Sequence, residues 1–75
     1  MKPTEIARIQ AYLRKTFDNN RITVPTPPKE SAPVEAYIGD EFFGVIYRDE
    51  DEGEVSYSVV MSILEMDLPN IAEVL

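Results

Sequence analysis

Apolar positions near the start of the chain recur with the period of a helix. Four apolar residues are spaced by three and four positions: Ile6, Ile9, Leu13 and Phe17. At 100° per residue they fall in one stripe about 80° wide. Pro3 suits the first turn of a helix, where its missing N–H group costs nothing. The pattern predicts a helix over residues 3–17 with one face built for burial.

After residue 20 the pattern changes to that of strands. Alternating apolar and polar residues, β-branched side chains and turn residues predict strands over 21–25, 34–38, 41–48 and 54–67. Four prolines make residues 25–33 a stiff, extended loop between the first two strands. Apolar residues at helical spacing in 69–75 suit a short terminal helix, which is too short to be stable alone.

The turns between the strands set a register. A tight turn of two residues, Gly39 and Asp40, joins 34–38 to 41–48 and sets Val34 opposite Val45. A longer turn over 49–53 sets Arg48 opposite Glu54, so that unlike charges face each other. Both turns predict antiparallel pairing.

The predicted fold class is α+β. One N-terminal helix packs across a mainly antiparallel sheet of three or four strands, in two layers, and residues 1–75 form a single domain. A single helix covers one face of such a sheet and leaves the other open.

The open face is predicted to be apolar, which is typical of an interaction surface. Its predicted residues are Tyr37, Phe42, Ile46, Val60 and Leu64. Small size favours the same interpretation, because a chain of 75 residues buries little surface on its own. The alternative is that residues 69–75 fold back and cover this face.

Charge narrows the range of functions. Fourteen acidic residues against seven basic ones give a net charge of −7, which repels nucleic acids and anionic lipids on average. Five of the basic residues lie within the first 21 positions, so an alternative function is nucleic-acid association through the helix residues Arg8, Arg14 and Lys15. The chain has neither an apolar stretch of membrane-spanning length nor a signal-peptide pattern, so we expect a cytoplasmic protein.

Candidate chemistry is sparse. Without Cys or His the chain can build no disulfide, thiolate zinc site or imidazole base. The acidic run from Asp49 to Glu54 resembles the start of a calcium loop, but Gly53 falls at position 5 instead of 6 and Val60 stands where the loop needs Glu. We therefore predict no catalytic residue, no metal site and no cofactor, so that the protein is not an enzyme.

Three stretches of the chain resemble a known family. They are the helix around Gln10-Ala11-Tyr12-Leu13-Arg14-Lys15-Thr16-Phe17, the hairpin Ala36–Asp51, and Ser56-Tyr57 with Ile63–Leu68. In combination they are similar to a small alphaproteobacterial family of uncharacterised proteins, over roughly residues 2–68. The resemblance implies a cytoplasmic bacterial protein with no known activity, and it transfers no site residue.

Together these observations predict a small non-catalytic interaction or regulatory module that self-associates as a homodimer through the apolar sheet face. Nucleic-acid association and a role as a minor enzyme subunit are the alternatives.

Overall fold

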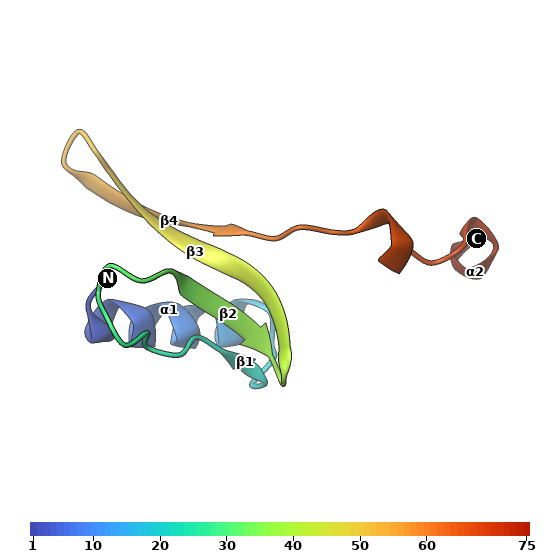
Figure 1. Cartoon of the computed structure of the whole chain (residues 1–75), viewed down its shortest axis with the longest axis horizontal. Helices are drawn as coiled ribbons and strands as arrows, with labels where there is room; N and C mark the ends of the chain where they lie inside the picture. The colour runs from blue at the N-terminus through green and yellow to red at the C-terminus, as the bar shows by residue number, and fades with distance from the viewer.

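The computed structural model describes residues 1–75 and has one helix against a four-stranded sheet (Figure 1). The elements are α1 (Pro3–Thr16), β1 (Ile22–Thr23), β2 (Val34–Ile38), β3 (Glu41–Asp51), β4 (Glu54–Val60), the 3₁₀ helix η1 (Glu65–Asp67) and α2 (Ile71–Val74). The strands are antiparallel and lie in the order β1-β2-β3-β4. This confirms the predicted α+β class and its short terminal helix.

The core is one layer of apolar side chains between α1 and the sheet. It consists of eight buried residues: Ile6, Ile9, Leu13, Ile22, Val24, Val34, Ala36 and Ile46. The predicted helical stripe is right for its first three members and wrong for Phe17, which is 63% exposed. The helix ends at Thr16, and Asp18 adopts a left-handed backbone at φ 50° that turns the chain away from the helix axis.

The β2–β3 hairpin contains a bulge that the sequence pattern did not reveal. Next to the turn the predicted register is right, with Tyr37 opposite Phe42. A register shift between Ala36 and Tyr37 leaves Phe43 without a partner, and Val34 then pairs with Ile46 instead of Val45. A shift by one residue exchanges the two faces of a strand, so Ile46 joins the core.

The second hairpin turn is shorter than predicted. Asp51 pairs with Glu54, so only Glu52 and Gly53 form the loop, at φ 51° and 82°. Two positive φ angles are typical of a type I′ turn, whose twist matches that of the flanking strands. β3 therefore extends to Asp51, and Arg48 lies opposite Tyr57 instead of Glu54.

Two strands are shorter than predicted. β1 has only two residues, because Pro25 lacks the N–H group that would continue the pairing. β4 ends at Val60, not at residue 67. The chain beyond it, residues 61–75, is the C-terminal arm, which leaves the sheet and extends along the long axis of the molecule (Figure 1).

Neither α1 nor any other helix has the length and apolar content needed to cross a membrane.

Replacing Ile46 tests the corrected face of β3. Ile46→Ala removes a side chain that is 2% exposed, so we expect the free energy of unfolding to fall by about 2–4 kcal/mol. The matched control is Val55→Ala on β4, where a 43% exposed side chain predicts a change of about 0.5 kcal/mol or less. Urea unfolding at one protein concentration measures both. Equal effects would contradict the core assignment.

Candidate functional site

The carboxylate of Glu5 joins the helix to the β3–β4 hairpin. One oxygen accepts a hydrogen bond of 3.0 Å from the backbone N–H of Lys2, which closes the first turn of α1. The other oxygen lies 3.0 Å from Nε of Arg48 on β3 and also accepts the hydroxyl proton of Tyr57 on β4. Because Arg48 and Tyr57 are cross-strand partners, the Glu5 carboxylate holds both β3 and β4 against the first turn of α1.

These contacts shift the acidity of the groups that make them. The Tyr57 hydroxyl first, and then the Lys2 N–H and the Arg48 guanidinium, stabilise the ionised carboxylate and lower the pKa of Glu5 from 4.5 to about 2. The same hydrogen bond raises the pKa of Tyr57, because its phenol donates to an anion. The carboxylate is therefore ionised throughout the neutral range and acts as a structural acceptor.

An open groove begins at this junction and runs between α1 and β4. Its volume is about 450 Å³, and we call it the α1–β4 groove. Its residues are Glu5, Arg8, Ile9, Tyr12, Leu13, Tyr57 and Val59. Ile9 and Leu13 are core residues, whereas Tyr12 is 68% exposed and Val59 is 40% exposed. The groove exists because α1 packs against β1 and the early strands, which leaves the helix-side face of β4 uncovered.

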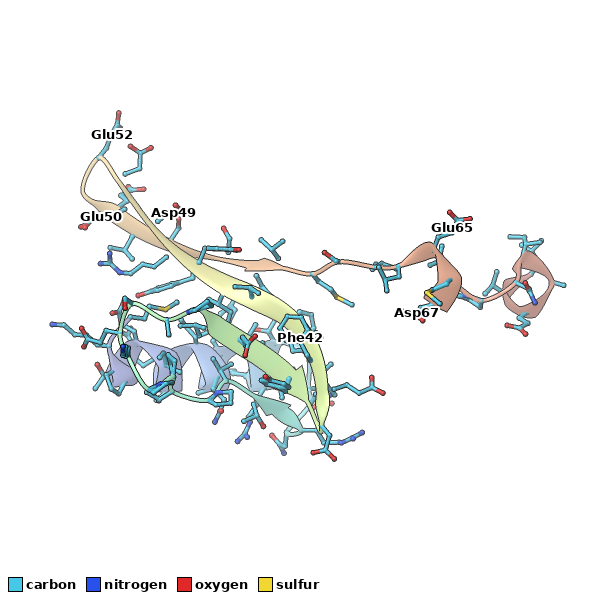
Figure 2. The ribbon with its side chains drawn as sticks, in the orientation of Figure 1. Phe42, Asp49, Glu50, Glu52, Glu65 and Asp67 are labelled. Carbon is cyan, nitrogen blue, oxygen red and sulfur yellow. The ribbon has the colours of Figure 1, made fainter.

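The C-terminal arm carries apolar side chains that its own chain leaves exposed. Each of the following is more than half exposed: Met61, Ile63, Leu64, Met66, Leu68, Ile71, Val74 and Leu75. Two acidic residues, Glu65 and Asp67, lie on η1, well away from the sheet (Figure 2). The arm is therefore apolar and acidic, and it has no basic residue.

The predicted interface residues lie at three different places. Tyr37 and Phe42 lie together on the sheet face opposite α1, with ring centroids 5.9 Å apart in an edge-to-face arrangement. Val60 ends β4 on that face, paired with Val45, and is 53% exposed. Leu64 lies on the arm, not on the sheet. Placing Ile46 on the open face is wrong, because the bulge in β3 turns it into the core.

Sequence reasoning missed both the Glu5 junction and the α1–β4 groove. Lys2 immediately precedes the helix and Glu5 follows it by three residues, a spacing typical of a capping box. This spacing is the sequence signal for the junction. Its contact to Tyr57 was hidden by the incorrect register of the second hairpin. Of the basic helix residues, Arg8 lines the groove, and Nε of Arg14 donates to the carbonyl oxygen of Ile22 at 2.7 Å.

Residues 5–67 match a family model described as a protein of unknown function (DUF3126), and the chain belongs to that family. The matched range starts at Glu5 and includes the arm as far as Asp67. Among curated proteins and solved structures, none matches this chain. The predicted resemblance to a family of uncharacterised proteins is confirmed, and its alphaproteobacterial source stays a prediction.

The Glu5 junction predicts a specific loss of stability in acid. A carboxyl group whose folded pKa lies below its unfolded value contributes stability that is fully present above about pH 4.5 and is lost as the pH falls towards 2. Glu5→Gln should lower the melting temperature at pH 7, and the gap from the wild type should close between pH 4.5 and 2. Thermal unfolding at constant protein concentration measures the gap.

The matched control is Glu41→Gln, at an exposed position outside the junction. It should melt close to the wild type across the same range. A Glu5→Gln gap that keeps its size down to pH 2 would show that the contribution of Glu5 does not depend on its charge.

Proposed function

We propose that this member of the DUF3126 family is a small, non-catalytic cytoplasmic module that acts through protein interaction and functions as a homodimer. The observation that carries the proposal is the excess surface of the single chain. Only nine of 75 residues are buried.

The chain exposes more surface and is less compact than typical folded domains of its size. Folded monomers of 8.5 kDa expose about 4,650 Å² on the usual scaling of surface with mass, whereas this chain exposes 6263 Å². Its radius of gyration is 14.7 Å, against about 11 Å for a compact domain of 75 residues. The difference of about 1,600 Å² exceeds the roughly 800 Å² that each partner contributes to a standard interface.

The chemistry of this surface favours association over catalysis. Twelve of the sixteen large exposed hydrophobic side chains lie close together in the sequence, from Val55 on β4 to Leu75 at the end of the arm. Large contiguous apolar surfaces in folded proteins mark protein interfaces or ligand grooves. Since the arm and the groove each occur once per chain, a second copy is the partner that the chain always has available.

Light scattering coupled to size exclusion tests the proposal. At micromolar concentration we expect a mass about twice the chain mass of 8.5 kDa, with dissociation on dilution. Exposed apolar area on both partners provides the physical reason. A mass of one chain at every concentration up to the solubility limit would contradict the homodimer.

A further inference from the structure

We infer that the C-terminal arm of one copy occupies the α1–β4 groove of a second copy, and that the second arm occupies the first groove in return. This inference rests on the proposed homodimer and names the surfaces that form it. The segment we assign to the groove lies within Met61–Leu68, of which the groove holds about four extended residues.

The groove has the size and shape of a site for an extended segment. Its volume of about 450 Å³ lies in the range of roughly 300–1,000 Å³ that is typical of concave binding sites. Along α1 it runs from Glu5 to Leu13, which is about 12 Å at the helical rise. Four extended residues span about 13 Å. Its lining includes the apolar residues Ile9, Leu13 and Val59 and the two tyrosines, Tyr12 and Tyr57.

The arm is built to leave its own sheet. No glycine or proline lies between Val60 and Pro69, so the segment lacks the residues that make a tight reversal easy. Leu64 and Leu68, which flank η1, both have extended backbones, at ψ 137° and 139°. In Figure 2 the arm projects beyond the sheet, with Glu65 and Asp67 far from Phe42. Its apolar side chains are thus presented away from the groove of the same chain.

Charge favours the pairing of arm and groove. The arm contains Glu65, Asp67 and Glu73 and no basic residue. The groove contains the guanidinium of Arg8, whereas its one carboxylate, Glu5, is already neutralised by Arg48. An acidic arm beside a basic helix surface is electrostatically complementary, which fixes orientation and suppresses wrong partners.

The exchange also closes. One groove and one arm per chain give two identical contacts related by a two-fold axis, which leaves no free arm to recruit a third copy. The exchange covers exposed apolar side chains of the arm and of the groove in both copies. The complex therefore contains two chains and does not extend into a fibre.

Two variants that fail separately and recover together test the exchange. Tyr12→Glu places a charge in the groove at a side chain that is 68% exposed, so α1 keeps its core contacts. The second variant combines Leu64→Glu with Met66→Glu on the arm, where both side chains are also exposed. Each variant alone should raise the dimer dissociation constant by about tenfold or more. An equimolar mixture should form a mixed dimer, because one intact arm then meets one intact groove.

Native mass spectrometry separates the species, since the variants differ in mass, and far-UV circular dichroism checks that each is folded. The control is Tyr47→Glu, which puts the same charge on the opposite sheet face at a tyrosine that is 53% exposed. It should dimerise like the wild type. The mixed dimer should exceed the dimer fraction of either variant alone at equal total concentration.

The remaining outcomes distinguish the homodimer from the exchange of arms. If the wild type is dimeric and only Tyr47→Glu dissociates it, the homodimer stands and the exchange is wrong. If both test variants dissociate but their mixture stays monomeric, Tyr12 and the arm do not meet, and the exchange is again wrong. A monomeric wild type overturns both the exchange and the proposed function.

Discussion

A helix of 14 residues cannot cover a four-stranded sheet, and this limit determines the rest of the structure. Burial favours packing α1 where the sheet offers apolar partners, which are on β1, β2 and the middle of β3. β4 pairs with β3 through its backbone, but no residue of β4 is buried. The groove, the exposed arm and the excess surface all follow from this partial cover.

Glu5 limits how far the uncovered hairpin can separate from the helix. Hydrophobic contact does not hold β4 against α1, so the two are joined by a carboxylate that accepts from Arg48 and Tyr57. Charge-assisted hydrogen bonds are directional, and this pair fixes the spacing between the helix start and the hairpin. The α1–β4 groove therefore has a definite width where it begins. A polar contact thus shapes an apolar site.

The sequence predicts the elements better than it predicts which way their side chains face. The period of α1, the hairpin at Gly39 and the strand 34–38 are local features and agree with the structure. The bulge at Phe43 and the two-residue turn at Glu52 are not local signals, because they depend on how two strands fit together. Each changes the register by an odd number of residues. Ile46 consequently moved from a predicted interface to the core, and Tyr57 pairs with Arg48 instead of Val45.

The most direct test of the arm exchange is whether the arm of one copy contacts the α1–β4 groove of another. A mixed sample of ¹³C-methyl-methionine protein and unlabelled protein isolates intermolecular nuclear Overhauser effects. We expect effects from the methyl groups of Met61 and Met66 in one copy to the rings of Tyr12 and Tyr57 in the other. Intermolecular effects to Tyr47 instead, or purely intramolecular effects to Tyr12, would contradict the exchange of arms.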